Sequence, residues 1–293
     1  MAQLPATNPQ ATSLLFTAHM DCVYPGGQTN VQPVFTTAGE IRTDGGNSLG
    51  ADDKAGIAAI LNALTYIQNA QLPHGEIRII FTVQEELGYR GIKQVPASML
   101  NGIHLVISMD PPVRVERDET AQMTVLHMPP AHPFVHLVRE SAHDCGFDPL
   151  ILFDEDGYVG GDTICLSPLG ALIADFCSTS RYAHTQHEHI RIADLISQAN
   201  WMVATTERAL NFDPSELDLR AVYGAEPIGA LTGVRKQVPL TENLLKEKRK
   251  LAQTLHLRPG PQQVPVLVHL SALAPRIGDP DLLRDVVEAY VQC

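Results

Sequence analysis

The chain has 293 residues, of which 44% are hydrophobic, and 33 acidic against 21 basic side chains give a formal net charge of -12. This length and composition predict one large α/β core, or one core with a small appendage. The negative charge argues against nucleic acids and anionic membranes as partners, because both would repel an acidic surface.

Targeting signals and cysteine spacing predict an intracellular protein. The sequence contains no run of about 18 apolar residues, so no membrane span is predicted. The start of the chain, MAQLPATNPQATSLL, lacks the basic and apolar regions of a signal peptide. The five cysteines form no C-x-x-C pair, which predicts reduced thiols instead of disulfides or a zinc ribbon. We therefore expect a cytoplasmic protein.

Short apolar runs alternate with helical patterns along the chain. Residues 13–18 (SLLFTA) predict a buried strand, and residues 53–68 carry apolar side chains at helical spacing, with Asp53 as a helix N-cap. The further predicted elements are strands at 76–83, 104–109, 150–153 and 171–177, and helices at 133–143 and 193–210.

This alternation predicts a three-layer α/β/α fold with a mainly parallel, mixed central sheet. We expect a single catalytic domain over residues 1–293, with its core at about 13–212. Residues 213–293 form an appended segment whose role the sequence leaves open; it includes a charged helix that we interpret as a solvated surface.

Polar residues follow three of the predicted strands. His19 and Asp21 follow the first strand, Glu85 and Glu86 the second, and Asp110 the third. Because ligands bind beyond the carboxyl ends of the strands in open α/β sheets, these side chains are expected to converge.

Their chemistry is that of a zinc hydrolase, which needs imidazole and carboxylate ligands beside a carboxylate base. Asp21 is expected to accept a hydrogen bond from the far imidazole nitrogen of His19 and to fix its tautomer. Glu85 and Glu86 would repel each other in an apolar site unless a cation neutralised one, so one should bind metal and the other transfer protons. Asp52, just before a helix, can bridge two cations.

The motifs AHMDCVYPG, TDGGNSLGADDKAG, TVQEELGYRG, VISMD and SRYAHTQHEH resemble the dizinc exopeptidase superfamily, and most closely its peptidase T relatives. Residues 181–188 and the turn at 160–162 also resemble tetrahedral dodecameric aminopeptidases. The resemblance spans about residues 14–210 and implies a zinc-exopeptidase-like fold.

The resemblance also implies the metal ligands. One ion would take Asp52, Glu86 and His184, and the other would take Asp52, His19 and Asp110. Asp at the position of Asp110 resembles the aminopeptidase branch of the superfamily. Zinc is the expected metal, with cobalt or manganese as alternatives, because mixed imidazole and carboxylate sites accept them as well.

The same resemblance makes Glu85 the general base and Asp21 the residue that orients His19. It also implies a cis peptide between Asp52 and Asp53. The expected reaction is hydrolysis of the N-terminal peptide bond of short peptides. The alternatives are an amidohydrolase that acts on N-acyl amino acids or related amides, and a metal-binding scaffold without activity; retention of Glu85 argues against the scaffold.

The chain also departs from its relatives. The interval from Asp110 to His184 is too short for both the lid domain of peptidase T and the remaining core, and that from Asp21 to Asp52 is too short for the domain inserted in tetrahedral aminopeptidases. The N-terminal hairpin and helix expected in the family are not found before the first strand, and Cys22 replaces the usual Thr. We expect neighbouring copies in a homo-oligomer to close the lidless site.

Four other residues have more than one interpretation. His187 and His189 compete with His184 as ligands, but only His184 fits the H-T-x-x-E pattern, and we expect the other two at the surface. Asp162 is either a helix N-cap or a carboxylate behind the metal site. Tyr182 is expected to be a packed tyrosine in preference to an oxyanion donor. Substrate preference, the native metal and oligomer size stay open.

Overall fold

The computed structural model describes residues 1–25, 31–111, 122–128, 130–153, 161–166, 171–177 and 180–212, so the appended segment at 213–293 lies outside the described residues. In chain order the described elements are β1 (Ala2–Leu4), β2 (Leu14–His19), β3 (Pro33–Phe35), β4 (Glu40–Thr43), α1 (Ala51–Asn69), β5 (Ile77–Thr82), η1 (Ile92–Gln94), η2 (Ala97–Met99), β6 (Leu105–Met109), β7 (Met123–Leu126), α2 (Pro133–Asp144), β8 (Leu150–Phe153), α3 (Thr163–Leu166), β9 (Leu172–Phe176), β10 (His189–Arg191) and α4 (Ile192–Ala209).

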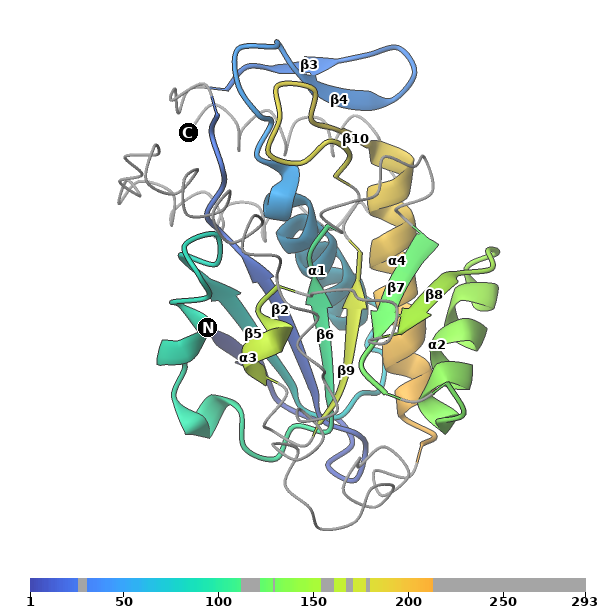
Figure 1. Ribbon diagram of the computed structural model, residues 1–293. Coiled ribbons are helices and arrows are strands. Elements are labelled where there is room, and N and C mark those ends of the chain that lie inside the picture. Colours follow the sequence, from blue (N-terminus) through green and yellow to red (C-terminus); the bar gives the residue numbers. More distant parts are fainter. Residues whose placement is uncertain are drawn as a thin grey trace.

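The central sheet has the strand order β1-β5-β2-β6-β9-β7-β8 (Figure 1). Strands β5, β2, β6 and β9 are parallel neighbours, and β7 is parallel to β8. Strand β1 is antiparallel to β5, and β7 is antiparallel to β9. The sheet is therefore mixed but mainly parallel, as predicted, and β5, β2, β6 and β9 bring their carboxyl ends to one edge.

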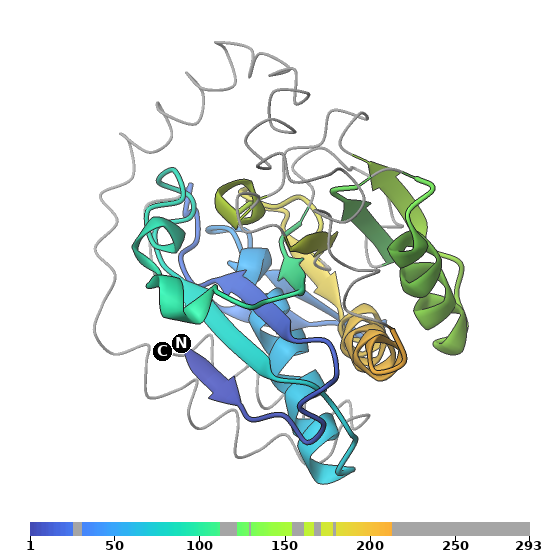
Figure 2. The same cartoon turned by 90° about the horizontal axis from the view of Figure 1, so that it is seen from below.

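Helices cover both faces of this sheet. On one face α1 packs against β2 and α4, and α2 packs against α4 (Figures 1 and 2). On the other face Ile92 of η1 and Leu166 of α3 join a cluster with Leu15, Ile80 and Val106 of the sheet. The predicted three-layer fold is confirmed, and within the described residues its second helical layer consists of short helices.

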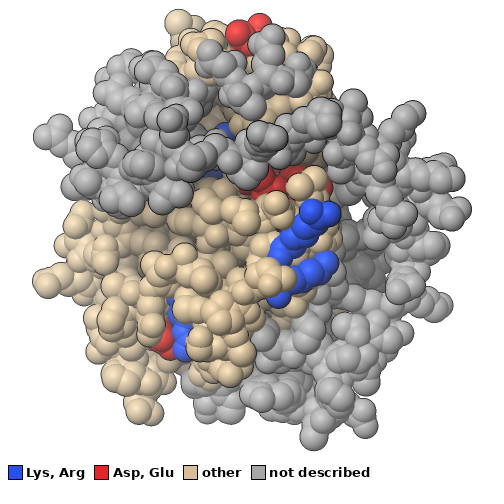
Figure 3. All heavy atoms as spheres, turned by 90° about the vertical axis from the view of Figure 1, so that its left-hand side faces the viewer, with Lys and Arg blue, Asp and Glu red and all other residues tan. Residues whose placement is uncertain are grey.

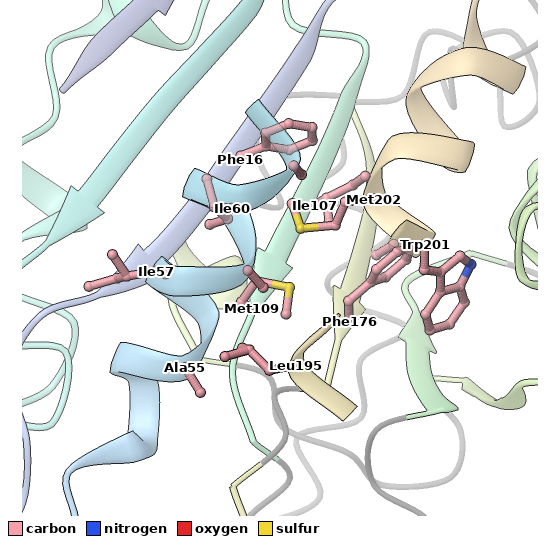
Figure 4. Close-up of a cluster of buried hydrophobic side chains, with 14 of the residues drawn as sticks. Phe16, Ala55, Ile57, Ile60, Ile107, Met109, Phe176, Leu195, Trp201 and Met202 are labelled. Carbon is pink, nitrogen blue, oxygen red and sulfur yellow. The ribbon is translucent and has the colours of Figure 1, made fainter. Parts of the chain in front are cut away.

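The larger core lies between the sheet and helices α1 and α4, as Figure 4 shows. Phe16 of β2 points into it, whereas its neighbour Leu15 points into the opposite cluster, because side chains alternate along a strand. Trp201 of α4 is 0% exposed, and its ring stacks on Phe176 of β9 at a centroid distance of 4.0 Å. The indole Nε1 donates a hydrogen bond to Ser141 Oγ on α2 at 2.9 Å.

A second, small sheet has the antiparallel order β10-β4-β3. It lies at the end of the molecule toward which the parallel strands point (Figure 1). A further bridge pairs Arg181 with His189, and Glu188 between them accepts hydrogen bonds from the backbone at the start of α1. Sequence patterns did not predict these strands, because three or four residues are too few to show a period.

The described residues also bear on the lid, membrane spans, surface charge and cysteines. Between β6 and His184, the described elements belong to the main sheet or pack on it, and they form no separate lid domain. Across the described chain, no helix has both the length and the apolar character needed to cross a bilayer. Figure 3 shows that acidic and basic side chains of the described residues lie beside each other on the face it presents. Of the cysteines, Cys22, Cys145, Cys165 and Cys177 are free.

Candidate metal centre

The residues expected at the site lie around the carboxyl edge of the main sheet. His19 ends β2, Asp110 follows β6, and both Glu85 and Glu86 lie in the loop after β5. Asp52 lies in the first turn of α1. His184 lies in the segment between the Arg181 bridge and β10, so the site joins both sheets.

Two groups of potential ligand atoms share Asp52. In one group His19, Asp52 and Asp110 offer atoms that all lie within 4.8 Å of one another, and in the other Asp52, Glu86 and His184 do the same. Asp52 Oδ1 lies 3.0 Å from His19 Nε2, and Asp52 Oδ2 lies 2.7 Å from His184 Nε2. The two oxygens of one carboxylate therefore face different imidazoles, which is the arrangement expected of a bridging ligand.

Glu85 lies beside both groups. It forms a third set of potential ligand atoms with His19 and Glu86, again within 4.8 Å, and it is 5% exposed. A general base must lie within hydrogen-bond reach of the water that it deprotonates. Its place next to both donor groups suits Glu85 for that task.

Burial and charge perturb the site strongly. Burial and the negative charge of Glu85 raise the pKa of Asp110 well above its ordinary value. Burial alone would raise the pKa of Asp52, but its contacts with His184 and His19 lower it. Burial alone would lower the pKa of His184, but its contacts with Asp52 and Glu86 raise it to about 11. Imidazole nitrogens and carboxylate oxygens, with several buried negative charges, fit a divalent cation such as zinc.

Asp21 contacts His19 through its backbone. The carbonyl oxygen of Asp21 lies 2.9 Å from His19 Nδ1, whereas the carboxylate is farther from it, at 3.7 Å. The carboxylate instead accepts hydrogen bonds from the backbone N–H groups of Glu85, at 3.0 Å, and Glu86, at 3.1 Å. The tautomer of His19 is therefore set by a carbonyl, and the Asp21 side chain holds the loop with both glutamates.

The turn before the regular part of α1 is irregular. Gly50 has a φ of 73°, the Asp52–Asp53 peptide is cis as the resemblance implied, and neither Asp52 nor Asp53 has helical backbone angles. Asp53 Oδ1 accepts a hydrogen bond from Gly56 N at 3.2 Å, so Asp53 caps the regular helix as predicted. A Cβ at Gly56 would lie 2.4 Å from Asp53 Oδ1, which explains the glycine there.

Left-handed backbone occurs in the loop that carries Glu85 and Glu86 and in the segment that carries His184. Gln84 has a φ of 58° and Tyr89 a φ of 59° on either side of the glutamate pair, while Tyr182 and His184 have φ values of 55° and 65°. Such conformations cost on the order of 1–3 kcal/mol each for residues other than glycine. Strain of this kind collects at functional sites, where the surrounding structure enforces it.

Sequence reasoning assigned no role to Glu188, although it lies in the H-T-x-x-E pattern. Its side chain is 0% exposed and accepts hydrogen bonds from Gly50 N at 2.7 Å, Asp52 N at 2.9 Å and Ser180 Oγ at 2.7 Å. Burial and the nearby charge of Asp52 raise the pKa of Glu188 to about 7. Its spacing from His184 was the available signal.

Gly161 and Asp162 lie against the site. A Cβ at Gly161 would lie 1.7 Å from Asp110 Oδ2 and 3.2 Å from Glu85 Oε1, so any side chain here would displace the Asp110 carboxylate. The carboxylate of Asp162 accepts a hydrogen bond from the hydroxyl of Thr82, at the end of β5. Of the two interpretations of Asp162, this contact favours a carboxylate behind the site.

His187 and His189, the alternatives to His184 as metal ligands, and Tyr182 lie outside the groups of potential metal ligands that the described residues form. Neither His187 nor His189 belongs to a group of potential metal ligands among the described residues. His187 is exposed as expected, but His189 is only 9% exposed, because β10 pairs with β4 and the ring of Tyr182 lies 5.7 Å from its own. Tyr182 is 48% exposed, so the expectation of a packed tyrosine was wrong.

Known proteins resemble parts of this chain. An uncharacterized protein of Bacillus subtilis, YqjE, is 44% identical over 91 residues, which are 31% of this chain and 24% of that protein. Peptidase T of Pectobacterium atrosepticum is 62% identical over 48 residues, which are 16% of this chain and 12% of that protein. The matched segments thus span a quarter or less of these relatives.

The fold is shared with a solved structure, that of aminopeptidase PepT from Bacillus cereus. The two have a TM-score of 0.60 and 19% sequence identity, and the match covers 71% of this chain and 83% of the other. The model of peptidase family M20/M25/M40 matches residues 15–208, a range that contains every residue of the candidate metal centre. The chain therefore belongs to peptidase family M20/M25/M40.

Proposed function

We propose that this protein is a metal-dependent aminopeptidase that removes N-terminal residues from short peptides. It uses two divalent metal ions, and zinc is the expected metal. The observation that carries the proposal is Asp52, whose two oxygens face His19 and His184 in two separate donor groups. Asp110 completes the first group and Glu86 the second. The family and the similarity to Peptidase T favour a peptide as substrate.

In this proposal the side chains divide the work. When bound, the metal ions would polarise the scissile carbonyl group and acidify a water molecule. Glu85 accepts the proton of that water and later passes it to the leaving amine, so no covalent intermediate with the protein is needed. Asp21 keeps Glu85 in place by accepting the hydrogen bond from its backbone N–H.

The test is hydrolysis by the full chain after reconstitution with zinc, cobalt or manganese. Free-amine di- and tripeptides are compared with their N-acylated counterparts, and Glu85→Gln serves as the matched variant because it removes the base and keeps the shape of the side chain. We expect cleavage of the free-amine peptides only, with turnover lost and metal binding kept in Glu85→Gln.

Other outcomes would replace the proposal. Cleavage of only the N-acylated substrates would identify an amidohydrolase with the same site. Metal binding without turnover of either set would favour a scaffold without activity. Homo-oligomerisation stays a prediction, and light scattering of the purified chain measures it directly.

A further inference from the structure

We infer that Glu188 is a positioning residue that fixes the bridging carboxylate of Asp52 and, through it, both metal positions. This inference rests on the proposed function of the same site. Glu188 does not belong to any of the groups of potential metal ligands among the described residues. Its effect would therefore reach the metals through the backbone that it holds.

The contacts of Glu188 converge on the turn that carries Asp52. Oε2 accepts from Gly50 N at 2.7 Å, and Oε1 accepts from Asp52 N at 2.9 Å and from Ser180 Oγ at 2.7 Å. The first N–H groups of a helix have no acceptor within the helix, so an acceptor from elsewhere must satisfy them. A carboxylate at 0% exposure is costly unless it is hydrogen-bonded, and here both of its oxygens are.

The same segment also holds Asp52 from its other side. His184 lies four residues before Glu188, and its Nε2 is 2.7 Å from Asp52 Oδ2. One short stretch of chain therefore contacts Asp52 at the backbone, through Glu188, and at the side chain, through His184. Because Asp52 Oδ1 faces His19 at 3.0 Å, a shift of this turn would move one oxygen in each donor group at once.

A general stabilising role for Glu188 is separable from this one. Asp194 provides the matched control, because its carboxylate pairs with Arg181 Nη2 at 2.8 Å and so also stabilises the segment that carries His184 and Glu188. Asp194→Asn weakens this ion pair but leaves the hydrogen bonds between Glu188 and the backbone of Gly50 and Asp52 intact. A role limited to stability predicts similar behaviour for variants at Asp194 and Glu188.

The experiment titrates cobalt into the metal-free full chain, and follows cobalt absorption, binding heat, and kcat and KM for a free-amine tripeptide. For Glu188→Ala we expect cobalt affinity and kcat to fall by about 10- to 100-fold, the range for partners that orient metal ligands, with a changed cobalt spectrum. The cobalt affinity and kcat of Glu188→Gln should lie between those of Glu188→Ala and the unmodified chain, because an amide NH2 group replaces the oxygen that accepts from Gly50 N. Asp194→Asn should keep the spectrum and affinity of the unmodified chain.

Circular dichroism first establishes that each variant is folded, and Glu188→Gln carries the test if Glu188→Ala is not. Unchanged affinity, spectrum and kcat in a folded Glu188 variant, or losses no larger than those of Asp194→Asn, would overturn the inference while leaving the proposed function intact. If the unmodified chain binds no cobalt, the proposed function fails, and the inference fails with it.

Discussion

Replacing Gly161 by alanine is expected to disable the donor group that contains Asp110. The added Cβ would lie 1.7 Å from Asp110 Oδ2 and 3.2 Å from Glu85 Oε1, and contacts under 3.0 Å essentially do not occur. Either the carboxylate or the loop must therefore move by about 1 Å or more. A misplacement of about 1 Å at a catalytic site costs on the order of 100-fold in rate.

The assay is kcat/KM for a free-amine tripeptide, together with the number of zinc ions bound per chain. We expect Gly161→Ala to lose about 100-fold in kcat/KM and to bind the Asp110-containing metal more weakly. Gly46→Ala is the control, because its Cβ meets only the side chain of Asp44, at 3.2 Å, on an exposed turn. If Gly161→Ala matched this control in activity and zinc content, the assignment of Asp110 to the site would be refuted.

Three further predictions concern the loop, the metal and the core. Asp21→Ala should lower kcat/KM by about 10- to 100-fold, because it removes the acceptor of the Glu85 and Glu86 N–H groups; activity within twofold of the unmodified chain would contradict this. Removing metal with a chelator should lower the free energy of unfolding by about 2.7 kcal/mol for each ion removed, relative to protein at a metal concentration 100 times Kd, and an unchanged Tm would count against bound metal. Trp201→Ala should cost about 3–5 kcal/mol in urea unfolding followed by circular dichroism, whereas Tyr66→Ala, at a 45% exposed position, should stay within about 0.5 kcal/mol; similar losses would refute the placement of Trp201.

The sequence predicted the elements whose own pattern is strong. Strands β2, β5 and β6 are short apolar runs that end in polar residues, and α1 repeats apolar residues at helical spacing, so each was placed to within about two residues. Strands β3, β4 and β10 were missed because each has only three or four residues, and because β10 pairs with β4 from a distant part of the chain. Pairing of that kind leaves no local period.

The candidate site shows the same division. The positions of His19, Glu86 and Asp110 after parallel strands predicted that they would converge, because such strands bring their ends together. The family resemblance, and not strand order, added Asp52 and His184 to this set. The direction of the Asp21 carboxylate and the three bonds of Glu188 depend on backbone turns that the sequence does not reveal. Such contacts follow only from the folded chain.

The proposed function requires that two metal ions share Asp52. The most direct test is an anomalous difference map from crystals grown with zinc, recorded at the zinc absorption edge. The account predicts two peaks, one among His19, Asp52 and Asp110, and one among Asp52, Glu86 and His184. No peak at these residues, or a single peak that Asp52 does not contact, would contradict it.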